Sequence, residues 1–469
     1  MTRPPEARTL GELRRSGWIS RSVREELRAN VVGRLRAGRR SFEEIHGYDD
    51  SVVPAVERAL LCGHDLVFLG ERGQAKSRMI RALAALLDEW IPQVAGSEIR
   101  DDPTAPVSAL ARERVAREGD ACPIEWVHRS DRFVEKLATP DTSVADLIGD
   151  VDPARVAEGR SLSDELTLHF GLIPRSNRGI FCVNELPDLT EKVQVGLFDI
   201  MEERDVQVKG YRVRLPLDVL IVASANPEDY TSRGRIITPL KDRYSAQIRT
   251  HYPKERELEL RIVRQEMELP APEGLRCFVP EFMEELIAEI TFQARNHPDV
   301  NQASGVSVRM SIANYETLVS AAVHRALRLR EPEAVPRISD LPALAASTSG
   351  KLELEYAGAE RSDGEVVEDL FKRAAKRIFD ERVEPAPLDS IVKAFDAGWK
   401  IEVSADMSAA EYLQGLDQIP GLRDAAFALA KSESPALVAS AIEFVLEGLH
   451  LSNRLNKTQH EGGELYTRA

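Results

Sequence analysis

The chain has 469 residues, of which 43% are hydrophobic, and its formal net charge is −15. That length is too great for one hydrophobic core and predicts about three structural units, while the negative charge argues against a general nucleic-acid binder. No apolar run approaches the ~18 residues that a membrane span needs, and the N-terminus lacks the order of charge, apolar block and small residues of a signal peptide. We therefore expect a soluble, cytoplasmic protein with no membrane span and no nucleic-acid partner.

The cysteines give no sign of a metal or disulfide framework. The chain contains only Cys62, Cys122, Cys182 and Cys277, which lie far apart and form no C-x-x-C pair. Neither a zinc site nor a set of disulfides is indicated, and buried thiols are the simpler interpretation.

Residues 1–40 form a basic N-terminal arm, with 11 arginines against 4 glutamates. Leu10, Leu13, Trp18 and Val23 give this arm an apolar side, which favours docking on a neighbouring protein surface. A nucleic-acid arm and a solvated helical face are the two alternatives.

A short segment before the first predicted strand could cover the base of a nucleotide. Ile45 and Gly47 lead into an apolar helix that ends at Cys62 and Gly63. We expect Ile45 and Gly47 to contact adenine; an ordinary helix entry is the alternative.

The next stretch predicts a strand, a glycine-containing loop and a helix start in direct succession. Residues 66–69 are apolar and β-prone. The loop that follows consists of Gly70, Glu71, Arg72, Gly73, Gln74, Ala75, Lys76 and Ser77. In a P-loop, backbone N–H groups and a lysine hold the phosphates and a Ser or Thr hydroxyl ligates Mg²⁺. Lys76 and Ser77 fit the last two roles, although Ala75 replaces the usual second glycine.

The residues after this loop predict a core-facing helix. Ile80, Leu83, Leu87 and Trp90 recur at steps of three and four residues, which is the spacing of one helical face. Because a glycine loop before a helix is often a plain turn, the nucleotide-binding interpretation depends on partners further along the chain.

The second chemical element is a buried strand that ends in two polar residues. Residues 179–186 read Gly-Ile-Phe-Cys-Val-Asn-Glu-Leu, the pattern of a Walker B strand, whose acid lies at the carboxyl edge of a parallel sheet. Glu185 is the candidate base for the attacking water. Asn184 stands where an aspartate usually supports Mg²⁺, partly through water, so magnesium binding or turnover is expected to be weaker. Two polar capping residues without a metal are the alternative.

Three further polar residues are candidates for the same site. Asn226 ends another buried strand, 219–225, and can hydrogen-bond the water or the γ-phosphate; a silent strand cap is its alternative. Arg243, near the end of the helix 238–243, could act as an arginine finger, or form an ion pair with Asp242 or a glutamate. Arg309, next to the helix-capping Ser307, could reach the γ-phosphate from a lid, or form a structural ion pair.

Two segments predict hairpins that project from the core. One lies around residues 166–174, and the other spans residues 205–215 with its turn at Lys209 and Gly210. Beyond residue 253 the pattern changes from alternating strands and helices to helices. The predicted parts are a basic arm (1–40), a nucleotide-binding core (41–253), a helical lid (254–335), a small β insertion plus helix (336–387) and a C-terminal helical region (388–469).

With these elements in this order, the chain resembles the AAA+ ATPases. The two hairpins, together with residues 179–189, 199–204 and 238–243, narrow the resemblance to the branch shared by MoxR-type ATPases and the ATPase subunit (subunit I) of magnesium chelatase. The likeness covers about residues 40–330 well and the rest broadly. It implies an α/β fold: a P-loop αβα sandwich with a parallel sheet and β-hairpin insertions, then an α-helical lid and a mainly helical C-terminal region.

The resemblance also implies roles and partners. Lys76 and Ser77 would bind ATP and Mg²⁺, Glu185 would be catalytic, Asn226 would be sensor 1, Arg243 a finger acting on the neighbouring subunit, and Arg309 sensor 2. A ring, commonly a hexamer, would hydrolyse ATP to remodel or activate a partner in a chaperone-like way, metal insertion being one such task. The expected partner is a von Willebrand A domain protein or a chelatase-like protein. An assembly switch or scaffold with little hydrolysis is the alternative, because Asn184 withholds a charge.

Overall fold

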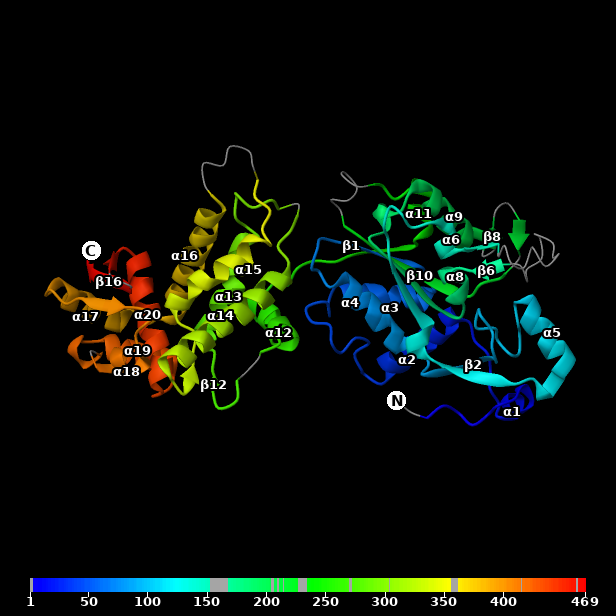
Figure 1. The fold of residues 1–469 in the computed structure, drawn as a ribbon, viewed down its shortest axis with the longest axis horizontal. Helices are drawn as coiled ribbons and strands as arrows, with labels where there is room; N and C mark the ends of the chain where they lie inside the picture. The colour runs from blue at the N-terminus through cyan, green and yellow to red at the C-terminus, as the bar shows by residue number, and fades with distance from the viewer. Residues whose placement is uncertain are drawn as a thin grey trace. The chain divides into compact units, whose positions relative to one another are not determined.

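A computed structural model describes residues 3–151, 168–203, 206–208, 211–213, 215–226, 234–269, 272–302, 304–355, 362–414, 416–460 and 463–469. The chain divides into two compact units, Met1–His251 and Tyr252–Ala469 (Figure 1). The division falls two residues before the boundary expected from the sequence.

The first unit is built on a parallel five-stranded sheet. Its strands lie in the order β11-β1-β10-β7-β4, and each neighbouring pair is parallel. The sheet strands are β1 (Leu66–Leu69), β4 (Phe133–Leu137), β7 (Gly179–Asn184), β10 (Val219–Ala225) and β11 (Ala246–Arg249). Because parallel strands end at the same edge, the residues after β1, β7 and β10 meet there.

Helices cover both faces of this sheet. Ile180 and Cys182 of β7 join a cluster with α2, α3 and α4, whereas Phe181 and Val183 face a cluster that includes α6, α9 and α11. Every residue of β7 and β10 is buried, as expected for strands covered on both faces. The helices are α1 (Leu10–Arg15), α2 (Val23–Arg36), α3 (Val52–Cys62), α4 (Lys76–Ala82), α5 (Ala109–Glu118), α6 (Val144–Leu147), α8 (Leu172–Arg175), α9 (Glu191–Glu203) and α11 (Thr238–Arg243). The predicted αβα sandwich is confirmed.

Three antiparallel pairs add to the first unit. They are β2 (Trp90–Val94) with β3 (Ile124–His128), β5 (Gly149–Val151) with β6 (Leu168–Phe170), and β8 (Val206–Val208) with β9 (Tyr211–Val213). The last pair is the hairpin predicted at 205–215, although its turn at Lys209 and Gly210 lies outside the described residues. The other predicted hairpin differs, because β6 pairs with β5 and the helix α8 follows it.

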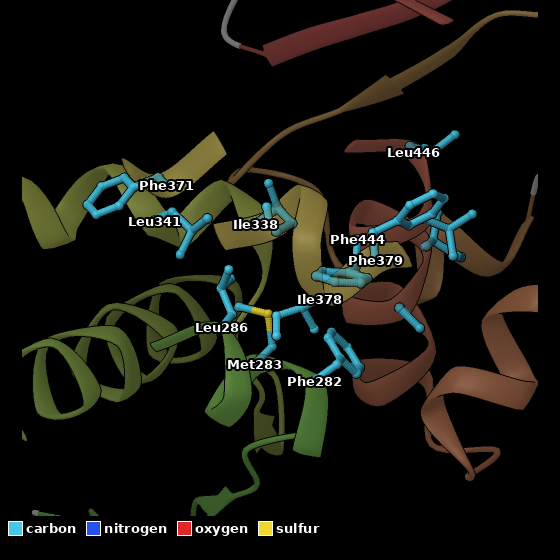
Figure 2. Packing of buried hydrophobic residues seen from close by; sticks show 14 of the residues in the cluster. Phe282, Met283, Leu286, Ile338, Leu341, Phe371, Ile378, Phe379, Phe444 and Leu446 are labelled. Carbon is cyan, nitrogen blue, oxygen red and sulfur yellow. The ribbon is translucent and has the colours of Figure 1, made fainter. Parts of the chain in front are cut away.

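Most of the buried apolar residues in the second unit belong to one large hydrophobic cluster, with a small second cluster around Ala322, Ala326 and Ala334. Figure 2 shows part of the large cluster, where Phe282 of α13 and Phe379 of α16 meet Phe444 of α20, with the rings of Phe282 and Phe444 4.8 Å apart. The helices are α12 (Arg256–Glu266), α13 (Glu281–Ala294), α14 (Val308–Leu329), α15 (Ala345–Ser349), α16 (Asp363–Arg382), α17 (Pro385–Asp396), α18 (Ala409–Gln414), α19 (Leu422–Ala430) and α20 (Pro435–Leu451). Among the described residues no single helix is long and apolar enough to cross a membrane; only α19 and α20 qualify together, across a 117° bend.

The C-terminal part differs from the predicted helical region. β14 (Ile401–Val403), β15 (Leu455–His460) and β16 (Gly463–Arg468) form an antiparallel sheet, and β12 (Arg276–Cys277) pairs with β13 (Glu333–Ala334). The edge strand β15 is mostly polar, which hid it from an apolar pattern. The small β insertion predicted within 336–387 is reduced to a bridge between Val300 and Leu354 in the described residues.

Two expectations for the first unit were also wrong. The helix after the loop ends before Trp90, because α4 passes through a 3-10 turn (Leu83–Leu86) into β2. The basic arm was expected to dock on a neighbouring protein surface. Instead its apolar residues Leu10 and Leu13 are buried against Val94 and Ile124 of the same unit.

Candidate active site

The loop predicted to bind phosphate leads from β1 directly into α4. Its backbone is left-handed at Gly73 (φ +73°) and at Ala75 (φ +55°), the residue that precedes α4. A side chain at Gly70 would collide with Thr250 and Gln74, because an added Cβ would lie 1.9 Å from Thr250 Oγ1. Glycine is therefore favoured at position 70 by the close approach of the Thr250 and Gln74 side chains. Ala75 adopts the conformation that favours glycine, despite its side chain.

Side chains beneath the loop fix its shape. Gln74 Oε1 accepts from Thr250 Oγ1 (2.7 Å) and from the Glu71 N–H (3.1 Å). The Tyr48 hydroxyl lies 2.6 Å from the Gln74 carbonyl oxygen and 2.9 Å from that of His251, and burial raises the pKa of Tyr48 to about 12. These bonds tie the loop to Tyr48 and to the residues that follow β11.

Lys76 holds a buried positive charge at the centre of the site. Its side-chain amine donates to the carbonyl oxygens of Gly70 (2.5 Å) and Glu71 (2.8 Å) and to Asn226 Oδ1 (2.5 Å). Lys76 is 7% exposed, so the fold keeps its charge pointed at the loop. Ser77, the next residue, is half-buried in the first turn of α4.

The second predicted element lies at the same edge of the sheet. Asn226 Nδ2, which belongs to the side chain that accepts from Lys76, donates to Glu185 Oε2 at 2.8 Å. Lys76, Asn226 and Glu185 therefore form one hydrogen-bonded chain across β1, β10 and β7. This arrangement is the one that a shared nucleotide crevice requires, since the lysine and the carboxylate come from distant parts of the sequence.

Asn184 lies beside Glu185, with both ends of its amide engaged. Its Oδ1 accepts from Ser224 Oγ (3.1 Å), and its Nδ2 donates to Glu135 of β4. Glu185 itself is left-handed (φ +56°), and its N–H donates to Ser224 Oγ at 3.2 Å. The end of β7 thus places the neutral Asn184 side chain between Glu135 and Ser224, and the ionisable Glu185 side chain beside Asn226.

The donor set fits Mg-ATP. Mg²⁺ keeps several waters and is usually held by one or two protein oxygens plus substrate phosphates. No group of three or more His, Cys, Asp or Glu able to hold a metal occurs among the described residues. The Ser77 hydroxyl and the oxygens around Asn184 are the groups that would hold it.

Ile45 and Gly47, the residues predicted to contact adenine, are close in sequence to Tyr48, which contacts the loop at Gln74. Ile45 is 3% exposed and packs in the core with α2 and α3, while Gly47 has φ +78°. The turn that contains them is therefore positioned by Tyr48, which contacts Gln74. Adenine contact by Ile45 and Gly47 remains a prediction.

The two arginine candidates have other contacts in their own units. Arg243 pairs with Glu202 of α9 and stacks over the Phe198 ring, 5.5 Å from its centre, which is the ion pair weighed as its alternative. Arg309 is exposed in the first turn of α14, where its N–H donates to Ser307 Oγ at 3.1 Å. Arg309 belongs to the second unit, and its action on a nucleotide remains a prediction.

Sequence reasoning missed several residues that shape this edge. Tyr48, Ser224 and Thr250 brace the loop and the strand ends, and Glu135 contacts Asn184. Their roles depend on contacts between residues far apart in the chain, which no local pattern indicates.

A glycine-containing loop between the first strand and helix of a parallel sheet, with a polar second strand end beside it, is the arrangement found in P-loop nucleotide-binding folds. No model of a known protein family matches the chain. Curated relatives do. The chain is 31% identical over 224 residues to the magnesium-chelatase subunit ChlI of Anabaena variabilis (46% of this chain, 62% of that protein). It is 32% identical over 208 residues to the magnesium-chelatase 38 kDa subunit of Cereibacter sphaeroides (43% and 55%).

A longer match extends into the second unit. The chain is 25% identical over 343 residues to the ChlI subunit of Synechocystis, which covers 72% of this chain and 85% of that protein. The chain is thus similar in sequence to magnesium-chelatase ChlI subunits over parts of both units. The first two matches span about three fifths of the relatives' length. A solved chain from a BchI–BchD complex of magnesium chelatase (69% of this chain, 98% of that chain, 21% identity) has a TM-score of only 0.36, too low to support an argument.

Proposed function

We propose that the protein binds Mg-ATP and hydrolyses it to remodel or activate a partner protein. The single observation that carries this proposal is the chain of hydrogen bonds from Lys76 through Asn226 to Glu185. It joins a phosphate-binding charge to a carboxylate through one amide, at the edge of the sheet where ligands bind in such folds.

Each residue of that chain has a distinct task in the proposed reaction. Lys76 would exchange the carbonyl oxygens of Gly70 and Glu71 for phosphate oxygens, which carry more negative charge. Glu185 would orient the attacking water and take its proton. Asn226 would hold the Glu185 carboxylate in place and link its position to that of Lys76. When bound, Mg²⁺ would neutralise charge on the phosphates.

The proposal extends to a ring, with a hexamer as the expected size. Arg243 would then face the nucleotide of a neighbouring subunit. Its side chain is 41% exposed and its partner Glu202 is 36% exposed, and such pairs exchange easily because each is worth only about 0–1 kcal/mol. Arg309 would act from the lid. We propose a chelatase-like protein or, as the resemblance of the motifs implies, a von Willebrand A domain protein as the partner, and the cytoplasm as the place of action.

Nucleotide binding is tested with mant-ATP, a fluorescent ATP analogue. We expect Lys76→Ala to weaken binding roughly 100-fold, equivalent to about 2.7 kcal/mol. The matched control is Arg78→Ala, two residues further along α4, where Arg78 makes a 3.5 Å ion pair with Glu44. Equal affinity of wild type and Lys76→Ala would remove the assignment of the loop.

Hydrolysis is tested by phosphate release. We expect Glu185→Gln to bind mant-ATP but to release phosphate about 10²–10⁴-fold more slowly than wild type. If wild type binds the nucleotide and is no faster than Glu185→Gln, the protein is an ATP-dependent switch or scaffold. The uncharged Asn184 is the feature that favours this second function.

A further inference from the structure

Asn184 occupies the position of the usual magnesium-supporting acid, but a carboxylate lies directly beside it. The Asn184 Nδ2 donates to Glu135 Oε1, while its Oδ1 accepts from Ser224 Oγ at 3.1 Å. The amide is therefore held between two partners, with its nitrogen toward Glu135. The neutral Asn184 side chain thus holds the negatively charged Glu135 carboxylate of the neighbouring strand β4 in place.

Glu135 reaches this point from β4. In the parallel pairing of β4 with β7, Glu135 lies opposite Cys182 and Leu137 lies opposite Asn184. The side chain of Glu135 is only 21% exposed, so its charge is kept close to the strand ends. Burial, and after it the negative charge of Glu135, raises the pKa of the Cys182 thiol.

Arg81 connects Glu135 to the predicted metal ligand of the loop. Arg81 Nε and Nη2 donate to the two Glu135 oxygens at 2.7 and 2.9 Å, and these bonds raise the pKa of Arg81. Ser77 and Arg81 are four residues apart in α4, so they lie on the same face of the helix, about one turn from each other. The Glu135 carboxylate is thereby held on the side of α4 that carries the Ser77 hydroxyl.

We propose that Glu135 supplies the negative charge that Asn184 lacks and supports the magnesium ion of the bound nucleotide, directly or through one water. This rests on the proposed function. Hard cations such as Mg²⁺ take oxygen ligands and bind better beside an ionised carboxylate. Arg81 is 64% exposed, so its guanidinium can turn away into solvent and leave Glu135 to the metal. Asn184 is then a positioning residue for Glu135.

The test measures binding rather than turnover. Mant-ATP binding is titrated with Mg²⁺, and the half-saturating Mg²⁺ concentration is compared among variants. We expect Glu135→Gln to raise it roughly 10–100-fold, the range found when partners of metal ligands are removed. The matched control is Glu125→Gln, a strand glutamate that accepts from the Gly96 N–H at 3.1 Å, which leaves the Mg²⁺ requirement within twofold of wild type.

Two further variants separate this role from a structural one. The double variant Glu135→Gln with Asn184→Asp moves the charge back to β7 and is expected to restore most of the Mg²⁺ affinity. Arg81→Gln releases Glu135 and is expected to lower the half-saturating concentration or leave it unchanged. A merely structural ion pair would instead make Arg81→Gln and Glu135→Gln behave alike.

The outcomes distinguish this inference from the proposed function. If wild type fails to bind mant-ATP with Mg²⁺, both are wrong. If wild type binds it, and Glu135→Gln keeps the wild-type Mg²⁺ requirement or the double variant is no better than Glu135→Gln, only the role of Glu135 is overturned.

Discussion

The two edges of the parallel sheet are built from different kinds of polar contact. At the carboxyl edge, Lys76, Asn226 and Glu185 form a chain that contains a neutral amide. At the amino edge, charges are paired and closed off by the N-terminal helix α2. Arg132, before β4, makes two bonds to Glu26 of α2, at 2.8 and 2.6 Å, and their side chains are 1% and 4% exposed.

The same pattern repeats along the amino edge. Asp65, before β1, accepts from Arg24 at 2.7 Å and from the Ile221 N–H at 2.8 Å, while Asp218, before β10, accepts from the Val23 N–H at 2.7 Å. Residues of the arm therefore form hydrogen bonds and ion pairs with the charged side chains at this edge. The basic arm therefore has a structural role at the amino edge, whereas the polar groups that we propose to bind a ligand, Lys76, Asn226 and Glu185, lie at the carboxyl edge.

The largest expected effect comes from breaking the sealed edge. Arg132→Met leaves Glu26 buried without its charged partner, which typically costs about 3–5 kcal/mol of unfolding free energy. The measurement is urea unfolding followed by tryptophan fluorescence, to which the first unit contributes three of the four tryptophans. Arg14→Met is the control, since Arg14 and Asp120 are 57% and 69% exposed and such a pair is worth at most about 1 kcal/mol. A loss below that of the control would mean that the edge is not sealed by this pair.

Two asparagine variants, one at each edge of the sheet, test whether the two edges have different roles. Asn226→Ala removes the link between Lys76 and Glu185, and we expect phosphate release to slow roughly 10–100-fold, equivalent to about 1.4–2.7 kcal/mol, with mant-ATP affinity changed only a few-fold. Asn177 lies at the amino edge, where it donates to the Ile99 carbonyl at 3.0 Å and accepts from the Asp218 N–H at 2.9 Å. Asn177→Ala is expected to lower stability and to leave turnover per folded molecule intact. Equal effects of both variants on turnover would erase the distinction between the edges.

The parts predicted from sequence are those specified by short, local patterns. The strand before Gly70 and the strand that ends at Asn184 and Glu185 can be predicted from their apolar composition. In a parallel sheet the carboxyl ends of the strands lie at the same edge. The αβα sandwich and the likeness to magnesium-chelatase subunits followed from the order of these motifs. The meeting of Lys76 with Glu185 could thus be anticipated without coordinates.

The parts that escaped prediction depend on contacts between distant residues or on ambiguous spacing. Nothing local indicates that Glu135 bonds Asn184, or that Glu26 of the arm meets Arg132. Leu83, Leu87 and Trp90 fit a helical face, yet the chain turns into β2 before Trp90. The polar strand β15 has no apolar pattern of its own and is stabilised by pairing with β16.

The loop itself offers a smaller test at the carboxyl edge. Ala75 is left-handed, which costs an L-residue about 1–2 kcal/mol, while glycine loses about 0.5–1 kcal/mol more entropy on folding. We therefore expect Ala75→Gly to stabilise the first unit by up to about 1 kcal/mol, measured by the same unfolding assay. Gly73→Ala, at φ +73°, should shift stability in the opposite direction. Destabilisation by Ala75→Gly would show that the Ala75 side chain makes contacts worth more than the strain.

The smallest expected effect concerns the brace beneath the loop. Tyr48→Phe removes the hydroxyl that contacts the Gln74 and His251 carbonyls, at a cost near neutral pH of about 1 kcal/mol or less. Because burial raises the folded-state pKa of Tyr48 from 10.0 to about 12, the hydroxyl's contribution is complete below pH 10 and is lost as pH rises toward 12. Phenylalanine cannot ionise, so the stability advantage of wild type over Tyr48→Phe should shrink across that window. An advantage that stays constant from pH 9 to 12 would mean that the hydroxyl ionises as readily in the folded protein as in the unfolded chain, and that the loop is not held over a buried phenol.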